Sequence, residues 1–175
     1  TEPGAGSDTA SLRTSARREG GDYVINGSKV FISGAGETDV LVVMLRTSDN
    51  GARGITALLV PADAEGISYG KKEAKMGWNA QPTRMVTFDN VRVPVENRLG
   101  AEGQGFSIAM MGLDGGRINI ATCSVGTAQQ ALEEATAYVQ ERRQFDTAIA
   151  DFQHTQFKLA DMLTELVAAR QMIRL

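Results

Sequence analysis

The sequence predicts an α+β chain, in which an antiparallel β-barrel or sandwich is followed by long antiparallel helices of a helical bundle. Two observations predict it. Short apolar runs separated by turn residues fill the first half, whereas from residue 106 the apolar residues recur with helical spacing. The change falls at the glycine-rich stretch 100–105, so the expected domains are a middle β-domain of residues 1–99 and a helical domain of residues 100–175.

Strand-like runs at 23–25 and 30–32 flank Asn26-Gly27. Both of these residues tolerate the positive φ of a type I′ turn, so a β-hairpin is expected there. Continuous apolar runs at 40–45 and 55–60 predict two buried strands joined by a loop. Further strands are expected at 67–69, 85–88 and 91–93.

The helical part predicts one helix of nearly forty residues that ends near Arg143. A second helix is expected after Ala150, with Asp151 as its cap. Helices of this length need packing partners, which we expect in each other, in the rest of a longer chain and in neighbouring subunits. The first apolar stripe comprises Phe106, Met110, Leu113, Ile120, Val125, Ala128, Leu132, Ala135 and Val139, and the second comprises Phe157, Ala160, Leu163 and Val167.

The composition excludes several classes of protein. A net charge of −3 with scattered Lys and Arg argues against a nucleic-acid surface. A single cysteine, Cys123, which we expect in the core, excludes an internal disulfide and fits a reducing compartment. With one histidine, His154, expected to be structural, there is no Cys/His metal cluster. No apolar stretch approaches the roughly 18 residues of a membrane span. The chain opens without Met and its helical pattern continues to Leu175, so we expect an internal piece of a longer protein.

Three glycine-rich stretches could allow a ligand to approach the backbone closely. Residues 1–8 and 31–36 are turns beside strand-like runs, which is also what ordinary tight turns look like. Gly115 and Gly116 cost the predicted helix about 1 kcal/mol each relative to Ala. Either a ligand or a second helix would explain them.

Five motifs occur in the order in which one family carries them. These are TEPGAGSD at 1–8, NGSK at 26–29 leading into FIS at 31–33, GQGF at 103–106, RRQF at 142–145 and LADM at 159–162. Together they resemble the acyl-CoA dehydrogenase family, flavoproteins that oxidise acyl-CoA thioesters to 2,3-enoyl products. GWNAQPTR at 77–84 and GGRINIA at 115–121 resemble the branch that acts on isobutyryl-CoA.

The resemblance implies cofactor contacts to FAD. The Ser33 hydroxyl would hydrogen-bond flavin N5, and Phe31, where the family usually has Trp, would pack against the ring. The alternative is that Phe31 is a core residue and Ser33 a turn residue. Arg142 would reach the FAD of a neighbouring subunit, although a solvated helix end is the plain alternative. Further implied cofactor contacts are Thr1, Ile32, Gln144, Phe152 and Gln153.

Substrate contacts are also implied by the resemblance. Ser7 would bind the substrate or its pantetheine arm, and Gln81, beside Trp78, would contact the substrate through its backbone. The helical segment Asp114, Gly115, Gly116 and Arg117 would face the acyl-CoA. Members of the family carry the catalytic Glu either at the position of Gly116 or far downstream, so we expect no base in this chain and a Glu beyond Leu175. The isolated piece is therefore expected to be inactive.

The implied reaction removes a proton from Cα of the thioester and passes hydride from Cβ to flavin N5. The resemblance further implies a homotetramer that shares its FAD sites and passes electrons to an electron-transferring flavoprotein. Its location would be the cytoplasm in a bacterium or the mitochondrial matrix in a eukaryote. Two alternatives stay open: an acyl-CoA oxidase of the same fold, and a binding or assembly module without turnover.

Overall fold

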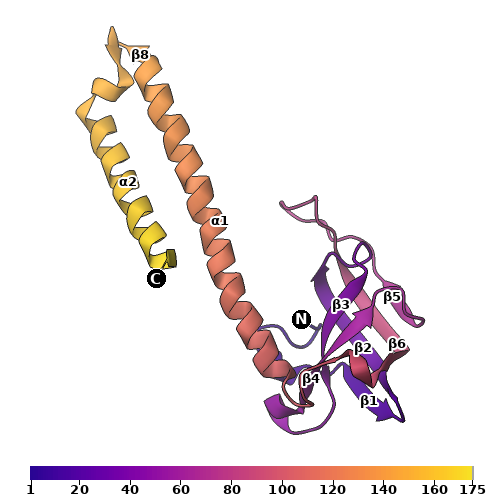
Figure 1. The fold of residues 1–175 in the computed structure, drawn as a ribbon. Coiled ribbons are helices and arrows are strands. Elements are labelled where there is room, and N and C mark those ends of the chain that lie inside the picture. Colours follow the sequence, from indigo (N-terminus) through magenta and orange to yellow (C-terminus); the bar gives the residue numbers. More distant parts are fainter. Residues whose placement is uncertain (175) are drawn as a thin grey trace. The chain divides into compact units, whose positions relative to one another are not determined.

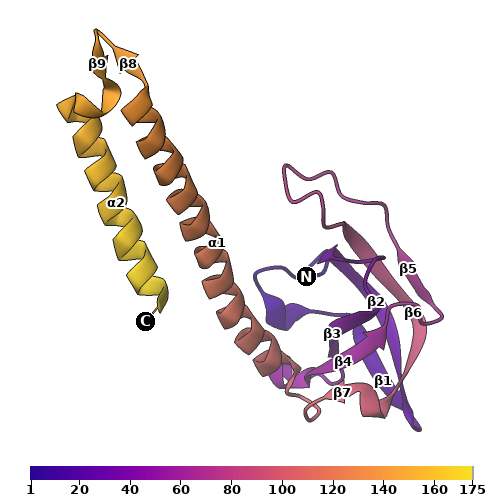
Figure 2. The same ribbon diagram turned by 45° about the horizontal axis from the view of Figure 1, so that its top comes forward.

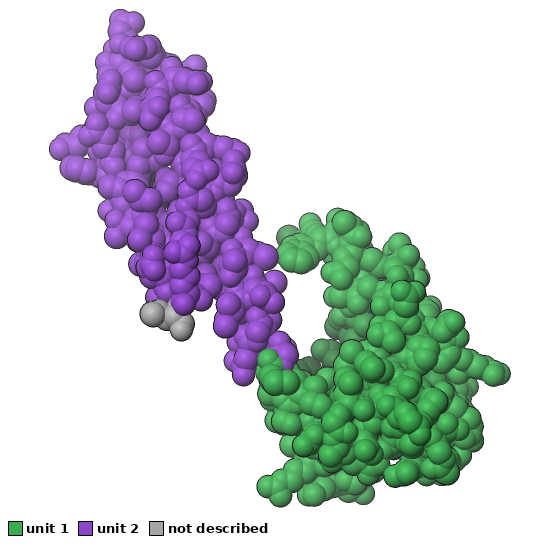
Figure 3. Space-filling model, viewed as in Figure 1, with its two compact units in different colours: residues 1–111 green, residues 112–175 purple. Residues whose placement is uncertain are grey.

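The computed structural model describes residues 1–174, and the chain divides into two compact units, residues 1–111 and residues 112–175 (Figure 3). The first unit carries a seven-stranded sheet, and the second carries most of helix α1, Gly105–Glu141, and all of helix α2, Gln153–Arg174. The helix begins within one residue of the predicted change in periodicity. The α+β class is confirmed.

The sheet has the strand order β5-β6-β2-β1-β3-β4-β7 (Figures 1 and 2). All its neighbouring strands are antiparallel except β1 and β3, which meet in parallel at Ser15 and Arg46. The edge strands β5 and β7 do not pair, so the sheet is open rather than closed into a barrel. Its strands are β1 Ser15–Glu19, β2 Asp22–Ser33, β3 Val40–Arg46, β4 Ile55–Pro61, β5 Ile67–Tyr69, β6 Thr83–Pro94 and β7 Arg98–Leu99.

The core of the first unit consists of alternate residues from the long strands, because successive side chains of a strand point to opposite faces. The strands predicted at 40–45 and 55–60 form the antiparallel pair β3 and β4. However, β3 is buried on one face only, since Val40 and Val42 are 48% and 54% exposed. The fully buried side chains include Tyr23, Ile25, Leu45, Leu58, Val60, Val86, Val91 and Val93.

The predicted hairpin at Asn26-Gly27 is wrong, because both residues lie inside the continuous strand β2. The pairing of β2 with β6 shifts register between Ile25 and Gly27, and Gly27 has a φ of 137°. A Cβ on Gly27 would approach Thr14 to 2.8 Å. The glycine is thus required by a bulge and a close approach, and the actual hairpin turn between β1 and β2 is Gly20-Gly21.

The strands predicted at 85–88 and 91–93 are one strand, β6. An irregularity at Asn90, whose φ is 52°, interrupts the apolar pattern without ending the strand. The Asn90 amide donates to Asn26 Oδ1 at 2.9 Å, and Asn26 Nδ2 donates to Asn90 Oδ1 at 3.2 Å. The two asparagines that look like turn residues therefore pair across β2 and β6.

Helices α1 and α2 lie side by side and are connected by a short hairpin of β8, Arg143–Gln144, and β9, Thr147–Ala148 (Figures 1 and 2). The predicted length of the first helix and the antiparallel arrangement are confirmed. Asp151 does not cap α2, because it belongs to the short 3-10 helix Ile149–Asp151. The Phe152 carbonyl, directly before α2, instead accepts hydrogen bonds from two amides of its first turn, those of Thr155 at 2.9 Å and Gln156 at 3.1 Å.

The apolar side predicted for α2 does not face α1. Phe157, Leu163 and Val167 are exposed, while Leu166 is buried between the helices. Apolar residues occur on two sides of α2, and periodicity alone does not say which side meets α1. On α1, the predicted stripe is half-buried at several positions, but Leu113 and Ile120 are exposed. Cys123 is also exposed rather than in the core, because nothing in residues 1–174 covers that face of α1.

Neither helix of the described residues combines the length and the apolar character that a membrane crossing requires.

Candidate functional site

The bulge in β2 presents Phe31 at the surface. The pairing with β6 shifts register between Lys29 and Ile32, and Phe31 has a φ of 59° with 64% of its side chain exposed. Left-handed backbone costs a bulky residue roughly 1–2 kcal/mol, and bulges redirect side chains. Phe31 is therefore no core residue, and its ring is available as an apolar wall.

Ser33 ends β2 opposite Thr83, and its side chain is exposed. Its hydroxyl makes no hydrogen bond to residues 1–174, so it can donate to or accept from a ligand. The turn after it is fixed by the Gly34 amide, which donates to the Pro82 carbonyl at 2.8 Å. That bond also brings the loop before β6, which contains Gln81, next to the Ser33 turn.

The loop that begins with Thr1 is attached to β2 at its first residue. The Val30 amide donates to the Thr1 carbonyl at 2.9 Å. The buried carboxylate of Glu2 accepts hydrogen bonds from the backbone amides of Arg13, at 2.6 Å, and Thr14, at 3.0 Å. The anchored loop keeps Thr1 beside the strand that carries Phe31. Ser7 lies farther along it, is exposed, and is not held by these bonds.

The Glu2 carboxylate also forms a buried ion pair, with Lys29 Nζ at 2.7 Å, and Lys29 donates a second bond of 2.7 Å to the Met44 carbonyl. Burial by itself raises the pKa of Glu2, but the bonds from Lys29, Thr14 and the Arg13 backbone outweigh it and hold the pKa at about 2. Burial lowers the pKa of Lys29, and the hydrogen bond and charge of Glu2 offset part of this decrease. The pair was not found from the sequence, although a lysine in an otherwise apolar strand signals a buried partner.

A small cavity of about 150 Å³ lies between β2, β3 and β6. Thr1 and Ile32, both predicted cofactor contacts, line it together with Lys29. The first unit therefore brings Thr1, Phe31, Ile32 and Ser33 to one region of β2. The remaining lining residues are Leu41, Val42, Val43, Met44, Val86 and Phe88.

Gln81 belongs to a tight turn in the loop before β6. Its amide donates to the Trp78 carbonyl at 3.2 Å, and its own carbonyl accepts a bond of 2.6 Å from Lys75 Nζ. Both backbone groups are thus engaged within the loop, which leaves one carbonyl lone pair and the side chain for a ligand. Trp78 has a φ of 58° and is 71% exposed. Lys75 was not identified from the sequence.

In the second unit, Asp114 and Arg117 form an exposed ion pair of 3.3 Å on α1. A Cβ on Gly115 or Gly116 would meet nothing within 4 Å. Residues 1–174 therefore provide no helix contact that explains these glycines, and the backbone there is open to a ligand or another chain.

The predicted cofactor contacts Arg142, Gln144, Phe152 and Gln153 lie in or next to the β8–β9 hairpin. The Ile149 amide donates to the Arg142 carbonyl at 2.8 Å and closes the hairpin. Its turn residues Phe145 and Asp146 have φ values of 52° and 58°, as a type I′ turn requires, and Phe145 is 91% exposed. The Phe145 ring and the Arg142 guanidinium are thus both exposed at this hairpin.

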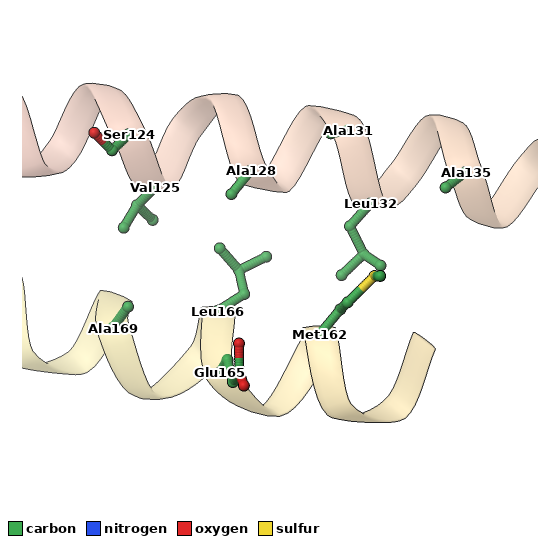
Figure 4. A pocket seen from close by; sticks show the side chains of 10 residues that line it. All are labelled: Ser124, Val125, Ala128, Ala131, Leu132, Ala135, Met162, Glu165, Leu166 and Ala169. Atoms are coloured by element: carbon green, nitrogen blue, oxygen red, sulfur yellow. The ribbon is translucent and has the colours of Figure 1, made fainter. Parts of the chain in front are cut away.

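A groove of about 640 Å³ runs between α1 and α2 in the second unit (Figure 4). Leu132 and Met162 point toward each other across it, whereas several other positions are alanines. None of the predicted site residues lines the groove. It is lined by Ser124, Val125, Ala128, Ala131, Leu132, Ala135, Met162, Glu165, Leu166 and Ala169.

Comparison with known proteins follows the division of the chain. Residues 1–91 match the family model of the acyl-CoA dehydrogenase middle domain, and residues 103–174 match that of the acyl-CoA dehydrogenase C-terminal domain. The mitochondrial isobutyryl-CoA dehydrogenase of Bos taurus is 56% identical over 174 residues, which cover 99% of this chain and 42% of the relative.

Solved structures give the same picture. Butyryl-CoA dehydrogenase from Megasphaera elsdenii matches with a TM-score of 0.93 and 44% identity, covering 99% of this chain and 46% of the other. A chain from the study of the electron transferring flavoprotein of Acidaminococcus fermentans matches with a TM-score of 0.92 and 43% identity, over 99% and 46%. The chain spans less than half the length of the relatives it matches.

Proposed function

The chain belongs to the acyl-CoA dehydrogenase family, and from that premise we propose that it is part of an FAD-dependent dehydrogenase of a short or branched acyl-CoA such as isobutyryl-CoA. The identity to bovine isobutyryl-CoA dehydrogenase supports the branched substrate. We also propose the division into a β-domain of residues 1–99 and a helical domain from residue 100. Its boundary lies between the two matched family models.

The observation that carries the cofactor proposal is the bulge that exposes Phe31 beside Ser33, whose hydroxyl makes no hydrogen bond within residues 1–174. A planar flavin needs an apolar wall and a fixed hydrogen-bonding group at its reacting edge, and these two residues fit both needs. Thr1 and Ile32 would hold the cofactor nearby. When bound, FAD would supply the acceptor for the hydride that leaves Cβ of the acyl group.

A second cofactor contact is proposed at the β8–β9 hairpin, from Arg142, Gln144, Phe152 and Gln153. The Arg142 guanidinium suits a diphosphate because it can donate two parallel hydrogen bonds. We propose that this hairpin binds the FAD of a neighbouring subunit in a homotetramer. Arg142→Ala in the full-length protein should then release FAD on dialysis while the fold persists, and unchanged flavin content would contradict the proposal.

Substrate contacts are proposed at Ser7, at Gln81 and along α1 at Asp114, Gly115, Gly116 and Arg117. The open backbone at both glycines supports the second group, because it leaves room for the acyl-CoA. The proton on Cα needs a carboxylate within hydrogen-bond reach. Glu2 is committed to Lys29, and Asp114 is paired with Arg117. The family resemblance puts the catalytic Glu either at the position of Gly116, which has no side chain, or far downstream. We therefore propose that a glutamate beyond Leu175 acts as the base, which a Glu→Gln variant with normal turnover would contradict.

The proposed electron acceptor is an electron-transferring flavoprotein, in line with the structural match to a chain studied with such a protein. The proposed location is the mitochondrial matrix for a eukaryotic source and the cytoplasm for a bacterial one. An oxidase of the same fold is the second candidate. Peroxide formed in air at the rate of substrate oxidation would identify it.

The experiment that tests the function uses the full-length protein with FAD and isobutyryl-CoA. Bleaching of the flavin absorbance on addition of the thioester is the expected result, because the bound flavin accepts the hydride. Ser33→Ala should keep FAD bound and bleach more slowly. Full FAD occupancy without bleaching by any short acyl-CoA would favour a binding or assembly module.

A further inference from the structure

Lys75 lies in the loop between β5 and β6 and directs its ammonium into that loop. Its Nζ donates to the Trp78 carbonyl at 2.9 Å, to the Gln81 carbonyl at 2.6 Å and to Thr83 Oγ1 at 3.0 Å. An ammonium has three N–H donors, so every one of them is used within eight residues of the chain. The neighbouring lysines Lys71 and Lys72, in contrast, are exposed.

The turn that Lys75 closes is costly to maintain. Trp78 adopts a φ of 58°, a conformation that a bulky side chain avoids, and its ring is largely exposed to solvent. Two backbone bonds also span this part of the loop, from the Gln81 amide to the Trp78 carbonyl at 3.2 Å and from the Glu73 amide to the Thr83 carbonyl at 2.9 Å. Strained backbone of this kind persists only where surrounding contacts hold it, and here Lys75 supplies most of them.

The turn also has a fixed position in the first unit. Thr83, the third acceptor of Lys75, pairs with Ser33, and the Pro82 carbonyl accepts the Gly34 amide. Lys75 therefore connects the conformation of the turn to the strand end that carries Ser33. A change at Lys75 would alter where the Trp78 ring and the Gln81 side chain lie, while the sheet core below remains intact.

We propose that Lys75 is a positioning residue for acyl-CoA binding, because it holds the turn that presents Trp78 and Gln81 beside the Ser33 region. The proposal rests on the proposed function of this chain. Lys75 touches no reacting atom. Its removal acts through the loop, so binding of the thioester is weakened more than the chemical step is slowed.

The test compares Lys75→Met with Lys71→Met in the full-length protein. Both variants remove one positive charge from the same loop, but only the first removes the three bonds. We expect Lys75→Met to raise KM for isobutyryl-CoA about tenfold with kcat changed less than about threefold and FAD content unchanged. Lys71→Met should behave as the wild type. Equal KM values for the two variants, or a loss confined to kcat or FAD content, would overturn the proposal.

Hydrogen exchange separates this inference from the proposed function. In the same variants, the Gln81 amide should exchange faster in Lys75→Met than in Lys71→Met, because its acceptor Trp78 is no longer held. If the Gln81 amide exchanges faster in Lys75→Met but the wild type oxidises no acyl-CoA, the proposed function is refuted. Lys75 then holds the turn but has no role in acyl-CoA binding. Unchanged exchange would show that Lys75 does not hold the turn, whatever the activity.

Discussion

The two units differ in how far each completes its own core. The first buries Tyr23, Ile25, Leu45 and other strand residues almost fully, and it pairs its buried ions. In the second, Leu166 is the one buried residue of α2 among those described, and large apolar side chains such as Phe157 and Met172 are exposed. A site on the first unit is thus supported by a fully buried core, whereas the helices expose apolar surface that partners can cover.

The largest expected effect concerns the ion pair of the first unit. Lys29→Met leaves the Glu2 carboxylate buried without its cation, which should lower the free energy of unfolding by about 3–5 kcal/mol. Urea unfolding of the 175-residue chain measures it. Lys71→Met is the matched control on an exposed lysine and should change the stability by less than about 0.5 kcal/mol. A loss below about 1 kcal/mol for Lys29→Met would show that water replaces the lysine.

Leucine truncations compare the buried core of the first unit with the exposed face of α2. Leu45→Ala creates a cavity in the first unit and should cost about 2–5 kcal/mol in the free energy of unfolding. Leu163→Ala removes an exposed side chain of α2, so the 175-residue chain should lose less than about 0.5 kcal/mol. Similar losses for both variants, measured by thermal unfolding, would mean that the outer face of α2 is covered in solution.

The Glu2 carboxylate should make the first unit sensitive to acid. Its pKa is lowered from 4.5 to about 2 in the folded state, so its stabilising contribution is complete above pH 4.5 and is lost as the pH falls toward 2. The contribution is at most about 3 kcal/mol. Free energies of unfolding between pH 6 and pH 2 should decline less steeply in Glu2→Gln. Parallel curves for the variant and the wild type would contradict this assignment.

Replacing a glycine by alanine should change the free energy of unfolding in opposite directions in the two units. Gly27→Ala places a Cβ 2.8 Å from Thr14 at a φ of 137°, so it should destabilise the chain by more than about 1 kcal/mol. Gly115→Ala meets open space on a helix and should stabilise it by at most about 1 kcal/mol. Thermal unfolding gives both values. A destabilising Gly115→Ala would reveal a close neighbour of α1 in solution.

The sequence by itself determined the features that depend on neighbouring residues. Apolar periodicity located β3, β4, β5 and both helices, since side-chain direction repeats every two residues in a strand and every 3.6 in a helix. The ordered motifs identified the family, which the comparisons confirm. The roles of Ser33, Arg142 and the other site residues remain predictions.

Only the tertiary structure decided the features that depend on distant partners. Asn26-Gly27 has the local preference of a turn, but pairing with β6 and contact with Thr14 make it part of a strand. Contact with α1 determines which side of α2 is buried. Lys29 and Lys75 have their roles because the fold brings hydrogen-bond acceptors to them. Local sequence determines which backbone conformations have low energy. Burial and hydrogen-bond partners from other elements then select among these conformations.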